Sequence, residues 1–195
     1  MRCTPSCGGV LFTLYSVARR NRVIAVVRPH TEFDFMAVWQ FRLGLIPRQP
    51  LIDRFGEIPE SRSTTDEWAW LWDTQPPEDY LCMIESFTVP YKSWTPDIMM
   101  WGSENGNRLH VAMEAGRVVE VNARLCPREK WIDFAEGIIL LAKHCDWVLS
   151  LKDSKLFLPD FSVLTLAVLE SNAVKFCKDP LEFLGGIGSG KYRPE

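Results

Sequence analysis

The alternation of hydrophobic and polar positions is most regular in the middle of the chain, where it predicts three consecutive strands. Each apolar or alternating run is separated from the next by a short turn that contains glycine. Runs joined in this way pair as antiparallel neighbours. In the last of them a period of two places Val119, Val121 and Ala123 on one face. We therefore expect a β-meander whose strands are residues 97–101, 108–113 and 118–125.

The spacing of the apolar positions changes after the meander from two residues to three and four. From Trp131 to Cys145 the apolar residues recur at helical spacing, which predicts an amphipathic helix. A short strand is expected at residues 147–151. Asp160 and Asp179 each stand before a helical pattern, where a carboxylate caps the first turn. The last helix is expected to stop at Gly185-Gly186.

The part of the chain that precedes the meander has a weaker pattern. Residues 22–27 and 35–41 are rich in β-branched and aromatic side chains and predict two strands. Several prolines and a glycine then predict a long loop over residues 47–63. Residues 80–89 fit either a strand or a short helix, and Pro90 closes either one.

Residues 66–72 also fit two different structures. Thr64 and Glu67 have the spacing of a capping box, which favours a short helix. Three tryptophans in this stretch alternate with other residues, which favours a strand that places all three on one sheet face. These tryptophans are Trp68, Trp70 and Trp72.

The order of the elements predicts an α+β fold, because strands come first and helices follow with one returning strand. We expect a mostly antiparallel sheet that contains the β-meander of residues 97–125 and is covered on one face by the C-terminal helices. A length of 195 residues suits one domain. We place this domain at residues 21–186, with a leader or loosely packed N-terminus at residues 1–20 and a flexible tail at residues 187–195.

Composition excludes several classes of protein. A hydrophobic content of 47% excludes wholesale disorder, and no apolar run is long enough to cross a bilayer, so we expect no membrane partner. The six cysteines lack a Cys-x-x-Cys pair and the three histidines lie far apart. We therefore expect no metal site and no cofactor. The glycine-rich residues 185–191 resemble a phosphate loop but follow a helix and lack the required Ser or Thr after Lys191.

The sequence predicts no catalytic residue, because no serine or cysteine stands in a nucleophile motif. Free thiols in a chain of this length are typical of a reducing cytoplasm, which is the location that we expect. Export is the alternative, since the apolar residues 10–18 end in Ser16-Val17-Ala18, which resembles a cleavage site.

The formal net charge is only −3, but the charges are distributed unevenly. Residues 53–86 contain nine acids and two arginines, which gives a local net charge of −7. Such a stretch repels phosphate backbones and attracts basic proteins. The five arginines of residues 1–30 are few for a nucleic-acid footprint. We therefore expect a basic protein partner and no nucleic acid.

The acidic stretch contains the candidate partner-binding residues. Tryptophan supplies a large and rigid contact area, and carboxylates steer a basic partner toward it. In the other interpretation the tryptophans cap the hydrophobic core and the acids face water, because tryptophan is highly buried on average. The candidate residues are Asp66, Glu67, Trp68, Trp70, Trp72 and Asp73.

The C-terminal half contains a series of motifs over about residues 97–184. They are Trp101-Gly102 with Gly106, Arg117-Val118-x-x-Val121-x-x-Arg124, Leu141-Ala142-x-x-Cys145, and Ser171-x-Ala173-x-x-Phe176-x-x-Asp179-Pro180-x-x-Phe183-Leu184. This half resembles a loosely defined group of uncharacterised bacterial proteins, some of which are encoded near polymorphic or secreted toxins and are regarded as candidate immunity proteins. Because the motifs are mainly turn, core and cap residues, the resemblance concerns the fold more than the activity.

Together with the acidic stretch, the resemblance implies a non-enzymatic protein-binding module, an immunity-type inhibitor that occludes a bacterial toxin. Two other functions stay open at this point. One is a small enzyme whose pocket is lined by the Trp-rich segment and the meander and uses His110 or Glu114. The other is a structural component of a larger bacterial assembly. The sequence makes no prediction of the oligomeric state.

Overall fold

The computed structural model describes residues 39–61, 69–151, 155–189 and 191, and the backbone of residues 18–19 and 22–23. The last two pairs belong to a separate unit, Met1–Ala37, in which β1 (Ala18–Arg19) pairs with β2 (Arg22–Val23) in antiparallel fashion. The remainder of the strand predicted at residues 22–27, and residues 35–38 of the next one, lie outside the described residues. All other elements belong to the unit Val38–Glu195.

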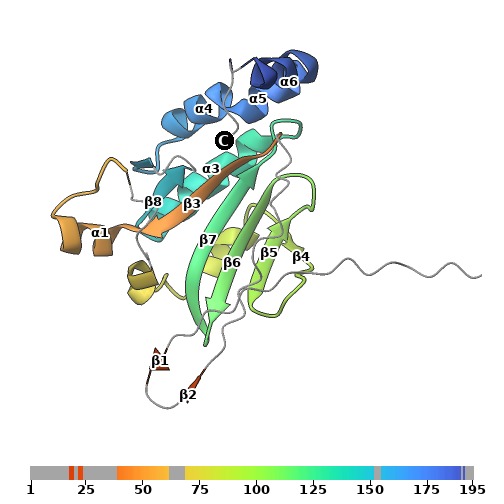
Figure 1. Cartoon of the computed structure of the whole chain (residues 1–195). Coiled ribbons are helices and arrows are strands. Elements are labelled where there is room, and N and C mark those ends of the chain that lie inside the picture. Colours follow the sequence, from red (N-terminus) through yellow and green to blue (C-terminus); the bar gives the residue numbers. More distant parts are fainter. Residues whose placement is uncertain are drawn as a thin grey trace, which may run out of the picture. The chain divides into compact units, whose positions relative to one another are not determined.

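The described part of this second unit contains one antiparallel sheet of seven strands in the order β4-β5-β6-β7-β3-β8-β9 (Figure 1). The predicted β-meander is confirmed as β5, β6 and β7, and the predicted strand at residues 147–151 is confirmed as β8. The strands are β3 (Phe41–Pro47), β4 (Pro90–Tyr91), β5 (Ile98–Gly102), β6 (Arg108–Glu114), β7 (Arg117–Leu125), β8 (Trp147–Leu151) and β9 (Leu156–Phe157).

Helices follow the strands in the C-terminal half and pack on the sheet. α3 contacts β7 and β8, and α4 packs against α3, so the predicted α+β fold is confirmed. The longest described helix is α3, and α4, α5 and α6 follow one another near the top of the view in Figure 1. The helical elements are α1 (Arg48–Phe55), the 3₁₀ helix η1 (Ala69–Asp73), α2 (Tyr80–Glu85), α3 (Trp131–His144), α4 (Phe161–Glu170), α5 (Asn172–Lys178) and α6 (Pro180–Gly188).

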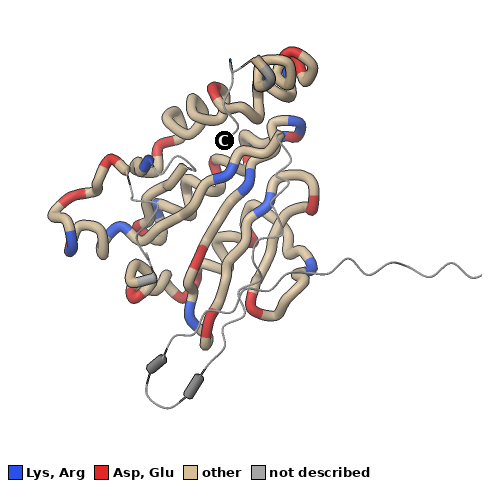
Figure 2. The backbone as a smooth tube through the Cα atoms, viewed as in Figure 1, with Lys and Arg blue, Asp and Glu red and all other residues tan. Residues whose placement is uncertain are grey.

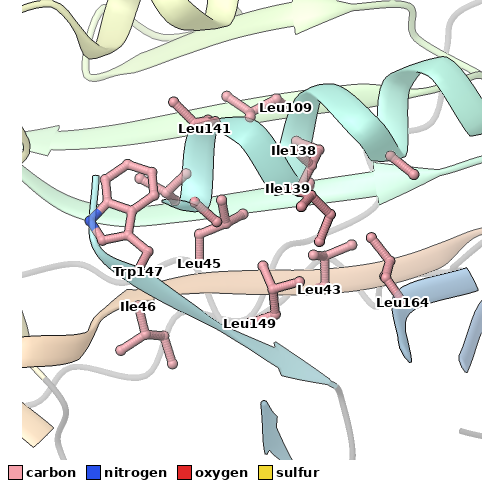
Figure 3. Packing of buried hydrophobic residues seen from close by; sticks show 14 of the residues in the cluster. Leu43, Leu45, Ile46, Leu109, Ile138, Ile139, Leu141, Trp147, Leu149 and Leu164 are labelled. Atoms are coloured by element: carbon pink, nitrogen blue, oxygen red, sulfur yellow. The ribbon is translucent and has the colours of Figure 1, made fainter. Parts of the chain in front are cut away.

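The core lies between one sheet face and α3. The register pairs Leu43 with Ala123 and Leu45 with Val121, so alternate residues of β3 and β7 share a face. Figure 3 shows Ile138 and Leu141 of α3 among the side chains of this core. Burying one such aliphatic side chain stabilises a fold by about 1.5–3 kcal/mol. The buried residues on this sheet face include Phe41, Leu43, Leu45, Leu109, Val111, Val121, Ala123 and Leu125.

The predicted helix caps are confirmed. Asp160 accepts a hydrogen bond from the backbone N–H of Val163 at 2.9 Å, and Asp179 accepts one from Glu182 at 2.8 Å. The last helix does not stop at Gly185-Gly186 but continues to Gly188. α5 was not predicted, because its seven residues are too few to show a helical period.

The long loop predicted over residues 47–63 is wrong, since α1 occupies Arg48–Phe55. Pro47 directly precedes this helix and Pro50 lies in its first turn, where no backbone N–H is needed for a helical hydrogen bond. Gly56 ends α1 with a left-handed φ of 80°. The strand that precedes the helix runs from Phe41 to Pro47, later than the prediction of residues 35–41.

The face assigned to Val119 is also wrong. The register pairs Ala112 with Glu120 and then Met113 with Val118, which leaves Val119 as an extra residue on β7. This β-bulge shifts the alternation, so Val118 is buried and Val119 is exposed.

Gly137 of α3 tests how closely the helix is packed. A Cβ added there would lie 2.3 Å from Cγ of Phe87. We predict that Gly137→Ala destabilises the fold by about 1–3 kcal/mol through overpacking, although alanine is the better helix former by about 1 kcal/mol. The matched control is Gly185→Ala in α6, where a Cβ meets nothing within 4 Å, and it should stabilise by about 0.5–1 kcal/mol. Urea unfolding measures both, and stabilisation by both substitutions would contradict this packing.

Candidate functional site

Three of the six predicted partner-binding residues can be placed. Asp66, Glu67 and Trp68 lie outside the described residues, whereas Trp70, Trp72 and Asp73 belong to η1. Two structures were predicted for this stretch, a helix and a strand, and residues 69–73 form a helix.

Trp72 is a core side chain. Its ring centroid lies 5.8 Å from that of Trp147 in an edge-on arrangement, and only 7% of the residue is exposed. Arg117 donates to the Trp72 carbonyl oxygen at 3.3 Å and so holds η1 at the start of β7. Trp72 therefore fits the interpretation in which a tryptophan caps the core, and its indole is not available to a partner.

Trp70 lies on a different side of η1. Side chains three residues apart eclipse one another in a 3₁₀ helix, which places Trp70 with Asp73 and apart from Trp72. The guanidinium of Arg54 lies 4.6 Å from the Trp70 ring centroid, and the Phe55 ring lies 6.3 Å away at an angle of 62°. Trp70 is half-buried, whereas 47% of Phe55 is exposed.

Exposed carboxylates lie near this aromatic pair in the sequence, on α1, just after it and on η1. Asp53 accepts a hydrogen bond from Gln49 one turn earlier in α1, at 2.7 Å. Asp73 lies 4.0 Å from Arg117 and stays largely exposed. Glu57 follows the end of α1 and is exposed as well. We call Asp53, Phe55, Glu57, Trp70 and Asp73 the acidic aromatic surface.

The end of the acidic stretch has a structural role. Nε2 of His144, in the last turn of α3, lies 2.7 Å from Oδ1 of Asp79, and this hydrogen bond lowers the pKa of Asp79. Burial, with a smaller effect of Asp79, raises the pKa of the neighbouring Cys145 thiol to about 12. A thiol with so high a pKa is protonated at neutral pH and is a poor nucleophile.

The sheet face opposite to the apolar core contains a second group of polar residues. Arg124 of β7 stands directly opposite Arg42 of β3 on one side and Arg108 of β6 on the other. Figure 2 shows the blue segments side by side on these three strands. We call Arg42, Arg124 and Arg108 the arginine row.

Arg124 is the most buried residue of the row. Its Nε and Nη2 donate to the carbonyl oxygens of Gly106 and Ser103, both at 3.2 Å, and Nη2 also contacts that of Glu104. These acceptors are neutral, so the charge of Arg124 is not cancelled by them. Burial, followed by the charges of Arg108 and Arg42, lowers the pKa of Arg124 to about 10.

His110 lies beside the row on the same face. Its Nε2 is 3.2 Å from Nδ2 of Asn122, which donates to it when the imidazole is neutral. Asn122 also donates to Glu120 on the same strand. Desolvation lowers the pKa of His110 below the ordinary 6.5, while Glu120 opposes this and the three arginines of the row add to it.

Within the described part of the chain, the residues named for the alternative enzyme do not lie together. Trp72 packs on the face that α3 covers, His110 lies on the opposite face, and Glu114 is exposed at the β6–β7 turn. Within the described residues no group of His, Cys, Asp and Glu could hold a metal ion. No helix in the described ranges is long and apolar enough to span a lipid bilayer.

A comparison of the chain with protein-family models, with curated proteins and with solved structures found no match. The resemblance to candidate immunity proteins therefore stays a prediction.

Sequence reasoning missed Phe55, Arg54 and the arginine row. Phe55 and Arg54 fall within the loop predicted over residues 47–63. A loop has no regular period that would assign its side chains to one side. The polar positions 108 and 110, and 122 and 124, do alternate with apolar ones, and this was the available signal. The position of Arg42 depends on the pairing of β3 with β7, which no local pattern shows.

His110 gives a test of the polar face. Because its pKa is lower in the fold than the 6.5 of an ordinary histidine, the unfolded chain binds more protons below that pH. Stability is therefore expected to fall as the pH drops from 6.5 through the folded pKa. We predict a smaller loss between pH 7.5 and 5.5 in His110→Gln than in the wild type, measured by urea unfolding. NMR titration of the ring, assigned with His144→Gln, should give a pKa under 6.5, and a higher value would contradict the burial of His110.

Proposed function

We propose that this chain is a non-enzymatic protein-binding module that binds a basic partner through the acidic aromatic surface. The observation that carries the proposal is the exposed Phe55 ring against Trp70, with exposed carboxylates on both contributing elements, α1 and η1. Protein interfaces commonly combine an aromatic centre with a charged rim. The aromatic residues supply affinity, and the rim charges steer the partner.

Charge supports the choice of a basic partner. The surface lies within residues 53–86, whose local net charge is −7. Asp66, Glu67 and Trp68 directly precede η1 in the sequence, and we retain them in the proposal. Trp72 is not retained because it is buried against Trp147.

The finer form of the proposal is an immunity-type inhibitor of a bacterial toxin in the cytoplasm. This form rests on the resemblance of residues 97–184 and on the expected location. The inhibitor would act stoichiometrically, with its carboxylates against lysines and arginines around the toxin's active site. An upstream gene that encodes a toxin domain would support it.

Phe55→Ser tests the aromatic centre. The partner is first identified by co-purification from the native cells, and the affinity is then measured with both proteins purified. We expect Kd to rise about tenfold or more, because truncating an interface aromatic removes a large part of the binding energy. Leu181→Ser on α6 is the matched control, since Leu181 is also an exposed apolar side chain. An equal effect of both substitutions, or none from Phe55→Ser, would refute the assigned surface.

The combined variant Asp53→Asn, Glu57→Gln, Asp73→Asn tests the rim. Rim charges act mainly through steering, so the association rate should fall several-fold at low salt and its dependence on salt should weaken. The control variant removes three exposed carboxylates on α3 and α4, with Asp133→Asn, Glu136→Gln and Glu170→Gln. Stopped-flow association over a range of salt concentrations measures both. Equal slowing by the two variants would mean that net charge, and not this surface, steers the partner.

A further inference from the structure

The side chain of Arg54 contacts both aromatic residues of the acidic aromatic surface. Its guanidinium carbon lies over the Trp70 ring, 4.6 Å from the centroid, and over the Phe55 ring, 5.8 Å from the centroid. The two centroids are 6.3 Å apart and the ring planes meet at 62°. Because the guanidinium is over both rings, both negative π faces act on the same cation. We call Phe55 and Trp70 the ring pair.

The fold holds one member of the ring pair in place. Trp70 is half-buried and belongs to η1, and Trp72 of the same element packs against Trp147 in the core. Arg117 donates to the Trp72 carbonyl oxygen and so holds η1 from a second side. A ring that is already fixed loses little conformational entropy when a ligand stacks on it. The ring pair is therefore preorganised on its η1 side.

Arg54 is held less firmly than the rings. It is exposed and lies in the last turn of α1, where its charge also interacts favourably with the C-terminal end of the helix dipole. Both interactions are modest at an exposed position, and an arginine side chain that is released regains many rotamers. Arg54 can therefore leave the ring pair at a cost that an equivalent contact from a ligand offsets.

The charges nearby in the sequence favour a cation as the replacement for Arg54. Asp53 and Glu57 are exposed and lie within three residues of it, and Asp73 ends η1. Arginine suits the ring pair better than lysine, because a planar guanidinium stacks on aromatic faces and is more weakly hydrated than an ammonium group. It also forms two parallel hydrogen bonds with one carboxylate. An arginine of the partner can thus make the contacts that Arg54 makes and add a carboxylate pair.

We propose that the basic partner places an arginine on the ring pair and displaces Arg54. This inference rests on the proposed function, because it names the group that the acidic aromatic surface recognises. Arg54 is then an internal competitor, which lowers the affinity of the surface for guanidinium groups. Its removal should tighten binding, whereas removal of an arginine that contacts the partner or supports the surface would weaken it.

Labelled octa-arginine and octa-lysine peptides carry equal charge and test the proposal on the full chain at low salt. Fluorescence anisotropy should show several-fold tighter binding of octa-arginine, and Phe55→Ser should remove this preference. Arg54→Gln should tighten octa-arginine binding about two- to fivefold, which corresponds to the loss of one exposed cation–π contact. Arg48→Gln is the matched control, because it removes the same charge from α1 while the Arg48 guanidinium pairs with Asp146 at 2.8 Å. The same two arginine variants are then compared with the purified native partner.

The outcomes separate this proposal from the one on which it rests. Equal affinity for the two peptides, or a preference that persists in Phe55→Ser, would overturn recognition of a guanidinium by the ring pair. Equal tightening by Arg54→Gln and Arg48→Gln would overturn the competition, since net charge alone would then explain both. Weaker binding of the peptide or of the native partner by Arg54→Gln would overturn it too. The protein-binding proposal fails on a different result, an unchanged Kd of the native partner in Phe55→Ser.

Discussion

The packing of α3 on the apolar sheet face is the interaction on which the acidic aromatic surface and the arginine row both depend. Leu43, Leu45 and Val121 must face the helix, and side chains alternate along a strand, so their neighbours must face away. Arg42 and Arg124 are placed on the polar face for this reason. The same layer also buries Trp147, against which Trp72 packs, and this contact fixes η1 with Trp70 on its other side.

The consequence is a separation of charge that the net value of −3 does not show. Acidic side chains accompany the Phe55–Trp70 pair on α1 and η1, and the arginine row crosses three strands of the sheet (Figure 2). The acidic aromatic surface combines an exposed Phe55 ring with exposed carboxylates, whereas the arginine row lies on the sheet face opposite to the core.

Local signals predicted the elements whose pattern is complete within a short segment. The meander alternates with a period of two, α3 repeats at three and four residues, and Asp160 and Asp179 cap the next helices directly. The sequence could not predict features that depend on distant pairing. Arg42 meets Arg124 only because β3 inserts between β7 and β8, and Trp72 is buried only because β8 brings Trp147 to it. The sequence did not predict α1 because prolines are typical of loops. Pro47 and Pro50 nevertheless stand at the start of the helix, where proline is tolerated.

The central claim is that a basic protein binds at α1 and η1. Hydrogen exchange of the chain, free and in complex with its purified partner, tests this claim most directly, because it locates the contact without any substitution. The account predicts that backbone amides of residues 51–57 and 70–74 exchange more slowly in the complex, while those of α4 and α6 keep their rates. Slower exchange confined to α4–α6, or to the strands of the polar face, would contradict it.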